Sequence, residues 1–334
     1  MDAVLAIWRN NKFGYECDLA LNIGRNKLLY PWYALKMFAF GVYAMFHFDV
    51  FHFHFGYSLF PYNLDLPLLK KMKKKFVMEF HGSDVRYQLY RERSSGWKDW
   101  KMPDRSGRRI KQLRKIFDYT DTVILHDEEL RKHLVGYQGN IVYVPLRVDI
   151  SRFEPSYPLA ACIKPIVVHA PTNREAKGSD YIIQAVECLK KKYDFEFILV
   201  ENKTQNEAIE IYKKADIIID QLRAGTYGVF AIESMALGKP VISYISEDMR
   251  GYFPEELPIV SASIDDITDK LEYLLKNGEL RNHLGLKGRE YVENYHDYRV
   301  IAWLLYDIYL GKCVKNTQKV AFQAVKEFKN KQMD

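Results

Sequence analysis

Short apolar runs alternate with helical patterns along most of the chain. In the helical stretches apolar residues recur every three or four positions, whereas the short runs are continuous and rich in Val, Ile and Phe. The expected strands cover residues 3–8, 49–55, 76–80, 122–126, 141–145, 165–170, 195–200, 217–219 and 241–245. The expected helices cover residues 32–46, 66–75, 128–134, 180–191, 207–214, 229–237, 264–276, 279–295 and 298–310. This alternation predicts an α/β architecture of parallel sheets with helices on both faces.

Residues 216–245 form the most complete strand–loop–helix–strand unit in the sequence. An apolar run ends at Asp220, a loop with Gly225, Thr226 and Gly228 follows, and a helical pattern continues until Gly238 stops it. The free backbone N–H groups at the start of such a helix, together with the helix dipole, favour a bound anion. The unit therefore predicts a phosphate site at this loop.

Glu233 lies more than one turn inside the expected helix, too far along to cap its first turn. A carboxylate there could accept hydrogen bonds from the hydroxyl groups of a sugar. An ordinary strand–helix unit with a solvated Glu233 fits the pattern equally well.

A second polar loop, residues 171–180, follows another expected strand. Lys177 and Arg174 are its cations, and either could form charge-assisted hydrogen bonds with a diphosphate. Gly178 allows a tight turn into the next helix. Because ligands of open α/β sheets bind beyond the carboxyl ends of the strands, we expect the two loops to face one site.

The spacing of Gly228, Glu233, Gly238 and Pro240, written GxxxxEsMAxGxPVI, resembles the signature of family 4 glycosyltransferases. That resemblance implies a GT-B fold, in which two Rossmann-like domains face each other across a cleft. It also implies that Glu233 is the second Glu of the family's E-x7-E motif and binds the donor ribose. Gly225 stands where the family has the first Glu, which contacts the donor sugar.

The resemblance extends to the loop 171–180. Lys177 and Gly178 match the family's Lys-Gly pair, while Thr172 stands where the family has an Arg, so Arg174 is expected to substitute. The residues that the resemblance assigns to the donor are Glu233, Gly225, Thr226, Tyr227, Gly228, Val229 and Thr172, and those that it assigns to catalysis are His81, Lys177 and Arg174.

Histidines gather near the ends of two expected strands in the first half of the chain. The period of two residues places His52 and His54 on one face of their strand. Such a pair could bind a metal, but no carboxylate or Cys motif accompanies it in the sequence, so we expect no metal. The next strand ends in His81, Gly82 and Asp84, which the resemblance places near the reacting sugar; a turn in which Asp84 caps the next helix is the alternative. His54, Gly82 and Asp84 are the expected acceptor-side residues.

The domain boundary is expected near residues 145–153, where Pro145, Val148, Asp149 and Phe153 resemble the family's linker. We expect an N-terminal acceptor-side domain at residues 1–147, a nucleotide-sugar domain at 148–310 and a basic tail at 311–334. The tail could return to the first domain, lie on a membrane or be disordered. Compared with the family, the first domain is expected to lack its first strand–helix unit and the glycine-rich turn between them.

Composition narrows the range of partners and compartments. The net charge is +6, which favours anionic partners such as a nucleotide, a phosphate or a membrane lipid. The four cysteines are far apart and form no CxxC motif, which fits a reducing cytosol, and no signal peptide is evident. Residues 28–48 are apolar but interrupted by Pro31, Lys36 and His47, so they favour a buried or interfacial helix over a membrane span. Lysine and arginine in residues 70–75, residues 91–115 and the tail suggest peripheral contact with an anionic membrane.

The sequence therefore predicts a metal-independent, retaining glycosyltransferase of the hexosyl type without a cofactor. It would transfer a sugar from a nucleotide diphosphate sugar to a glycan or a lipid-linked acceptor in the cytoplasm or on the inner face of the membrane, in the synthesis of surface polysaccharide or glycoconjugates. The main competing hypothesis is a non-catalytic glycosyltransferase-like binding subunit, which Gly225 favours. An epimerase or a phosphorylase of the same fold is a further hypothesis. A nucleic-acid-binding protein that uses residues 91–115 is a more distant one, and we expect no nucleic acid.

Overall fold

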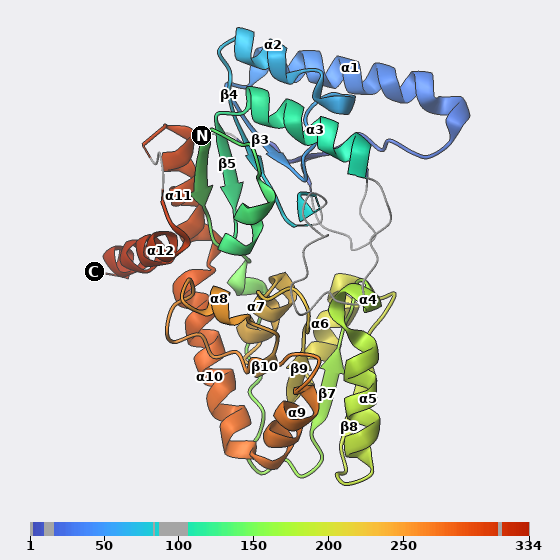
Figure 1. The fold of residues 1–334 in the computed structure, drawn as a ribbon, viewed down its shortest axis with the longest axis vertical. Coiled ribbons are helices and arrows are strands. Elements are labelled where there is room, and N and C mark those ends of the chain that lie inside the picture. The colour runs from blue at the N-terminus through green and yellow to red at the C-terminus, as the bar shows by residue number, and fades with distance from the viewer. Residues whose placement is uncertain (1–2, 10–16, 83, 87–105, 313–315, 334) are drawn as a thin grey trace.

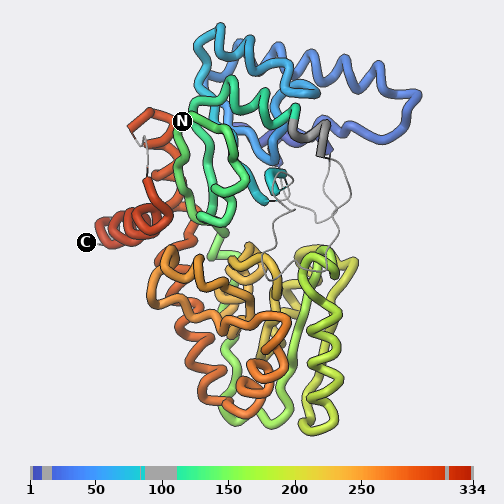
Figure 2. Tube along the Cα trace, viewed as in Figure 1, coloured from blue at the N-terminus to red at the C-terminus, as the bar shows by residue number. Residues whose placement is uncertain are grey.

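The computed structural model describes residues 3–9, 17–82, 84–86, 106–312 and 316–333. Figure 1 shows two lobes stacked along the long axis of the molecule, each built on a parallel sheet. We call them the first lobe and the second lobe in the order in which the chain enters them. Figure 2 shows that the chain passes once into the second lobe and that its last helices return to the side of the first. The expected α/β architecture is confirmed.

The sheet of the first lobe has four parallel strands in the order β3-β4-β5-β6. They are β3 (Val50–His54), β4 (Lys75–Glu79), β5 (Thr122–Leu125) and β6 (Asn140–Tyr143). Each lies within one or two residues of an expected strand, because continuous apolar runs bounded by polar residues fit a sheet that is buried on both faces. The first expected strand is reduced to β1 (Ala6–Ile7), which pairs with β2 (Leu19–Ala20) in a separate two-stranded sheet.

Helices from both halves of the chain cover the first sheet. On one face lie α1 (Tyr30–His47), α2 (Leu66–Lys71) and α3 (Ser106–Tyr119), packed on a core with Phe51, Phe53, Met78, Leu113 and Ile116. The other face is covered by α11 (Tyr298–Tyr309) and α12 (Gln318–Met333), packed on a core with Val77, Ile124, Val142, Ile301, Ile308 and Val325. The first sheet is therefore enclosed only when the C-terminal segment is in place.

The segment beyond residue 311 contains a docked helix, α12, so the first of the three expected possibilities is correct. Two side chains just before and within it hold it against the first lobe. The Asn316 side chain accepts a hydrogen bond from Tyr143 N at 2.6 Å and donates one to Tyr143 O at 3.0 Å. Gln318 Oε1 accepts from Glu128 N at 2.7 Å. These contacts satisfy backbone groups at the edge of the sheet that would otherwise need water.

The sheet of the second lobe has the order β10-β9-β7-β8, again all parallel. Its strands are β7 (Ile166–His169), β8 (Glu196–Leu199), β9 (Ile217–Ile219) and β10 (Val241–Ile242). The helices of this lobe are α4 (Arg174–Lys177), α5 (Ser179–Lys190), α6 (Gln205–Tyr212), α7 (Val229–Ala236), α8 (Glu247–Arg250), α9 (Ile267–Lys276) and α10 (Gly278–Tyr295). One core joins α5 and α9 to one face of the sheet and another joins α6, α7 and α10 to the opposite face.

Two local expectations differ from the structure. The expected helix at residues 128–134 is a 3-10 helix, η5 (Glu128–His133), which Asp127 caps by accepting from Leu130 N. The expected loop at 171–180 contains α4, because Asn173 accepts from Ala176 N at 2.9 Å and starts one helical turn. Gly178 then ends that turn with φ near +73°. Further 3-10 turns are η1 (Lys27–Leu29), η2 (Pro61–Asn63) and η6 (Ile150–Arg152).

We expect Phe322→Ala in α12 to lower the free energy of unfolding by about 3–5 kcal/mol, the usual cost of truncating a buried aromatic side chain. The Phe322 ring is 3% exposed and packs against Phe253, Tyr295 and His296. Val320→Ala is the matched control, because Val320 is 54% exposed on the same helix and should change stability by less than about 0.5 kcal/mol. Urea denaturation measures both. Equal effects of the two substitutions would contradict the docking of α12.

Candidate functional site

The loop between β9 and α7 is held in shape by the side chain of Gln221. Its Oε1 accepts from the backbone N–H groups of Arg223 and Ala224 at 2.7 and 2.6 Å. Its Nε2 donates to Thr226 O at 2.5 Å. These hydrogen bonds fold the loop back toward α7.

Gly225 occupies a position in this loop that a larger residue cannot adopt without strain. Its φ is +75°, in the left-handed region that L side chains rarely adopt. A Cβ atom there would lie 2.8 Å from Ser246 Oγ. A glutamate at this position would have to change both the backbone and Ser246, so the departure from the family pattern is part of the local fold.

Glu233 faces a cavity of about 230 Å³ between α7 and the segment that joins the lobes. The cavity is lined by Arg147, Val148, Asp149, Arg152, Phe153, Gln205, Val229 and Glu233. Gln205 Nε2 donates to Glu233 Oε1 at 3.0 Å. Burial raises the pKa of Glu233 to about 7, although the hydrogen bond from Gln205 and the charge of Arg152 oppose the rise. The carboxyl group is therefore poised to gain or lose a proton near neutral pH.

The two cations of the 171–180 loop are already paired with carboxylates. Lys177 Nζ lies 2.5 Å from Asp220 Oδ1, and the Asp220 side chain is fully buried at the end of β9. Arg174 forms two hydrogen bonds, of 2.8 and 2.5 Å, with Glu201 on the surface. Neither cation lines the cavity beside Glu233, where the positive groups are Arg147 and Arg152.

The remaining expected donor residues fall in different environments. Tyr227 is buried, and its hydroxyl group bonds to Tyr291 and His296, so its side chain belongs to the core. Val229 is 41% exposed at the start of α7 and lines the cavity, while Thr172 is exposed in the loop before α4.

Thr226 makes a contact between the two lobes. Its Oγ1 donates to Asp127 Oδ2 at 3.1 Å, at the end of the strand β5. Burial and the nearby charge of Glu129 raise the pKa of Asp127 to about 6. The glycine loop of the second lobe is thus joined to the carboxyl end of the first sheet.

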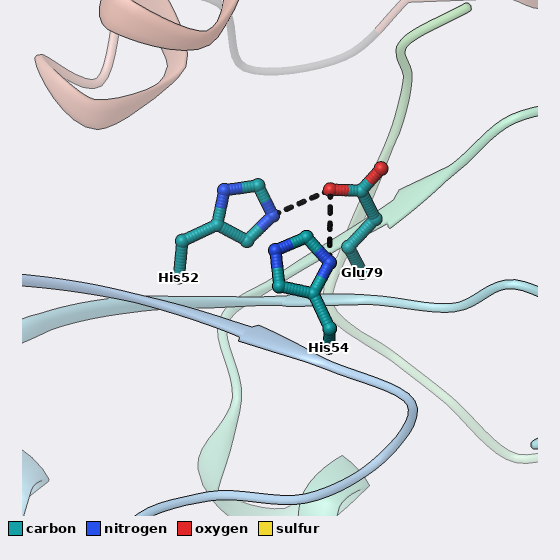
Figure 3. A group of neighbouring side chains, drawn as sticks. All are labelled: His52, His54 and Glu79. Atoms are coloured by element: carbon teal, nitrogen blue, oxygen red, sulfur yellow. Dashed lines mark ion pairs between the residues drawn. The ribbon is translucent and has the colours of Figure 1, made fainter. Parts of the chain in front are cut away.

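Four histidines and Glu79 come together at the carboxyl ends of β3, β4 and β5. Figure 3 shows His52 and His54 pointing toward the Glu79 carboxylate. His52 Nε2 lies 2.7 Å from Glu79 Oε2, and His54 Nδ1 lies 3.5 Å from the same oxygen. No carboxylate lies near the two histidines in the sequence, but the expectation that none accompanies them is wrong in the folded chain. The register of β4 against β3 places Glu79 beside His54.

Glu79 is fully buried and is also held by Arg147 from the segment between the lobes. The two Arg147 nitrogens lie 2.7 and 2.8 Å from the two carboxylate oxygens. Burial alone would raise the pKa of Glu79, but hydrogen bonds from His52 and Arg147 hold this pKa well below its ordinary value. Glu79 and Arg147 both stay ionised, because each charge stabilises the charged form of the other.

The other histidines form a directed chain of hydrogen bonds. His126 Nδ1 lies 3.2 Å from Val144 O, and a carbonyl can only accept, so His126 carries its proton on Nδ1. His126 Nε2 therefore accepts from His81 Nδ1 at 3.0 Å, which leaves His81 Nε2 as an acceptor. His54 Nδ1 lies 3.0 Å from that atom. Burial lowers the pKa of His54 to about 4 and that of His81 to about 2, so these rings are neutral.

The loop after β4 is closed by Asp84, which accepts from the backbone N–H groups of His81 and Gly82 at 3.0 and 2.7 Å. Asp84 is buried, so its carboxylate shapes the turn that holds His81. Gly82 has φ near +114°, a conformation for which glycine is suited. Two of the expected acceptor-side residues, Gly82 and Asp84, form this turn. The third, His54, reaches the turn through its contact with His81, which was expected to be catalytic.

The sequence alone missed several residues of this region, namely Glu79, His126, Asp127, Arg147, Gln205 and Asp220. One of them carries a local signal: Glu79 is a carboxylate in an otherwise apolar strand, which indicates a buried partner. The partners of the others are distant in sequence, so no local pattern identifies them.

Comparisons with known proteins agree with the resemblance seen in the sequence. A family of domains described as glycosyl transferase-like matches residues 183–305. Sucrose-phosphate synthase from Thermosynechococcus elongatus superposes with a TM-score of 0.58 at 18% identity, covering 86% of this chain and 80% of that one. HepE from Anabaena in complex with UDP-glucose gives 0.57 at 10% identity, covering 87% and 85%. A glycosyltransferase from Rickettsia africae gives 0.56 at 16% identity, covering 87% and 84%. No curated protein sequence matches the chain.

These matches confirm the expected GT-B fold, and the match over 183–305 confirms the resemblance to glycosyltransferases in the second lobe. Among the helices that the structure describes, none combines the length and the apolar character needed to cross a bilayer.

We expect the Glu233 carboxyl group to titrate near pH 7, because burial disfavours its charged form. Replacing Gln205 with Leu removes a hydrogen bond that stabilises the carboxylate, so this variant should titrate at a still higher pH. Carbon-13 NMR of the glutamate carboxyl groups measures both values, and the spectrum of Glu233→Gln identifies the signal. A titration near the ordinary value of 4.5 would show instead that the group lies in open water.

Proposed function

We propose that this chain, which has the GT-B fold and a glycosyl transferase-like domain at residues 183–305, transfers a sugar from a nucleotide diphosphate sugar to an acceptor hydroxyl group. The observation that carries this proposal is the Glu233 carboxylate facing a cavity beside the start of α7. A carboxylate in that position can accept hydrogen bonds from the two ribose hydroxyls, while the helix start attracts the diphosphate. The single helix α7 would thus bind both the ribose and the diphosphate of the nucleotide.

The donor is proposed to lie along α7 and the loops that flank it. Glu233 would bind the ribose, and the backbone N–H groups of Gly228 and Val229 would meet the diphosphate. Lys177 would reach the same phosphates by exchanging part of its contact with Asp220. HepE, a protein of this fold, is known in complex with UDP-glucose, so UDP-glucose is the first donor to test.

The reaction needs stabilisation of the charge that develops on the leaving diphosphate. Lys177 and the start of α7 would supply it at the donor, with Arg174 available if it releases Glu201. The resemblance implies that the anomeric configuration is retained and that the leaving group needs no metal. His81 and Gly82 would border the acceptor sugar, and His81 would act by position, because both of its ring nitrogens bond to other histidines.

The acceptor is proposed to be a glycan or a lipid-linked sugar in the synthesis of surface polysaccharide or glycoconjugates. A hydroxyl of such an acceptor would enter from the first lobe, on the side of His54. This assignment rests on the resemblance and on the position of the histidine-lined edge opposite the donor loops.

Gly225 favours a second candidate function, a subunit that binds a nucleotide sugar without transferring it. In the resembled family the residue at this position contacts the donor sugar, and here neither a side chain nor space for one exists. Such a protein would bind the nucleotide through Glu233 and show no transfer to any acceptor.

We expect Glu233→Gln to weaken binding of UDP-glucose by about 1.5–3 kcal/mol, because hydrogen bonds to a charged group contribute about that much. Glu255→Gln is the matched control, since Glu255 is an exposed glutamate outside the cavity. Isothermal titration calorimetry measures the affinities. Equal affinities in the two variants would place the donor elsewhere.

Removal of the Lys177 charge should reduce the rate of transfer more than donor affinity, because the charge on the leaving group is greatest in the transition state. Lys177→Met alone would leave the buried Asp220 unpaired, so we pair it with Asp220→Asn to keep the protein folded. Single-turnover transfer and calorimetry give the two quantities. Donor binding that depends on Glu233, without transfer by the native chain to any acceptor, would establish the non-catalytic subunit instead.

We also propose peripheral binding to an anionic membrane through the end of the first lobe that carries α1 and α2 (Figure 1). Trp32, Phe38 and Phe46 of α1 are exposed there, and Lys71 and Lys73 are exposed at the end of α2. Residues 91–105, most of the other expected basic segment, lie outside the described residues.

We expect the double variant Lys71→Gln/Lys73→Gln to bind anionic vesicles about 30-fold more weakly, since each basic residue near such a surface contributes about 1 kcal/mol. The control, Lys190→Gln/Lys191→Gln, removes two exposed charges from the second lobe. Co-sedimentation with phosphatidylserine vesicles at low salt measures the partition. Failure of the native chain to co-sediment would contradict the proposal.

A further inference from the structure

The histidine and glutamate cluster of the first lobe offers several metal-binding atoms within a small volume. The ligand atoms of His52, His54 and Glu79 all lie within 4.8 Å of one another. They come from the ends of the neighbouring strands β3 and β4, so the sheet fixes their relative positions (Figure 3). Donors on rigid strands are suited to hold an ion without a large rearrangement.

A further imidazole nitrogen, Nε2 of His81, lies beside His54. The carbonyl of Val144 fixes the proton of His126 on Nδ1, so His81 must donate through Nδ1 and keep a lone pair on Nε2. That lone pair lies 3.0 Å from His54 Nδ1. His54 Nδ1 therefore donates to His81 Nε2 when no ion is bound. Binding of an ion through His54 Nδ1 would move the His54 proton to Nε2 and would free the His81 Nε2 lone pair to act as a fourth ligand.

The histidines also have the outer partners that metal ligands usually require. The ring nitrogen of His52 that faces away from Glu79 lies 2.6 Å from the Tyr309 hydroxyl. Without an ion, His52 Nε2 donates to Glu79. A cation between them would replace that proton, and His52 would then carry its proton on Nδ1 and donate to Tyr309. His126 supports His81 in the same way. Such outer partners orient a ligating ring and select its tautomer.

We propose that His52 Nε2, His54 Nδ1 and Glu79 Oε2, with His81 Nε2 as a fourth ligand, bind one divalent transition-metal ion of the Zn²⁺ class. Three imidazoles and one carboxylate are a ligand set that Zn²⁺ accepts. The site lies on the acceptor side of the cleft, in the first lobe, and its existence does not depend on the proposed transfer reaction.

The distances fit one ion with small adjustments. Ligand atoms about 2.0–2.1 Å from a tetrahedral zinc ion lie roughly 3.4 Å from one another. The observed separations are 3.5 Å for His54 to Glu79, 3.0 Å for His54 to His81 and 2.7 Å for His52 to Glu79. The His52–Glu79 pair must separate by roughly 0.7 Å and the His54–His81 pair by roughly 0.4 Å, changes that small rotations of the imidazole rings can supply.

Among the residues that the structure describes, Arg147 opposes a cation at this site. Its guanidinium binds both oxygens of Glu79, so a metal would share the carboxylate with a fixed positive charge. Each carboxylate oxygen has a second lone pair, and Oε2 can therefore contact both groups. The repulsion should lower the affinity, and removal of the Arg147 charge should raise it. A site that did not involve Glu79 would not respond in this way.

Calorimetric titration of the full-length chain with ZnCl₂, after treatment with a chelator, tests the proposal. We expect one saturable site. His54→Ala should weaken it at least tenfold, and Tyr309→Phe, which removes the partner of His52, should weaken it about tenfold. Arg147→Gln should tighten it. His47→Ala and His283→Ala are the matched controls, because both histidines lie outside the cluster, and they should have no effect.

Titration with Co²⁺ in place of Zn²⁺ supplies a second measurement, which detects binding by absorption spectroscopy instead of by the heat of binding. Four-coordinate binding by this ligand set should give a visible absorption band that disappears in His54→Ala. Thermal melting shows that each variant is folded, and His54→Ala is preferred to Glu79→Gln, which would remove the carboxylate that pairs with the half-buried Arg147. The absence of a saturable site, or a site that survives in His54→Ala and weakens in His283→Ala, would overturn the proposal.

Discussion

The ion pair between the buried Glu79 and the half-buried Arg147 joins the first sheet to the segment that connects the lobes, and the rest of the site depends on it. Glu79 ends a central strand of the first sheet, and Arg147 lies in the segment that leads to the second lobe. Removing one partner of a buried pair leaves an uncompensated charge and typically costs about 3–5 kcal/mol. The pair therefore fixes where the chain leaves the first sheet. Because Arg147 also lines the cavity beside Glu233, the same contact connects the histidine cluster with the proposed donor pocket.

The second lobe meets the first through a loop whose shape is set by its own hydrogen bonds. Gln221 folds the loop, Gly225 supplies a backbone conformation that only glycine adopts easily, and Thr226 reaches Asp127 at the end of β5. A preformed loop loses little conformational freedom on binding. This loop shape has a consequence at Gly225. The Glu expected from the family is absent there, because the backbone is in the left-handed region and a Cβ atom would lie too close to Ser246.

The first sheet is enclosed by helices that lie far from it in the sequence, near the C-terminal end of the chain. The helices α11 and α12 cover one face, and Tyr309 from α11 reaches His52 inside the cleft. The segment that completes the core thus also supports the cluster of histidines. Close packing of this kind couples the C-terminal helices to the geometry of the cleft, because packed interiors transmit small displacements.

The sequence by itself determined the elements and their type. Apolar periodicity placed nearly every strand of the two main sheets and most helices. The residues from Gly228 to Pro240 resemble the signature of family 4 glycosyltransferases, and that resemblance implied the GT-B fold. Both signals depend on residues close together in the chain. It also indicated Glu233 and Lys177 as residues of interest, and it gave no sign that Lys177 pairs with Asp220. Only the tertiary structure decided which side chains meet. Strand register brought Glu79 to His52 and His54, the connection between the lobes brought Arg147 to Glu79, and the returning helices brought Tyr309 to His52. Those contacts join residues tens to hundreds of positions apart, and ion pairing and hydrogen bonding there depend on distances that no local pattern contains.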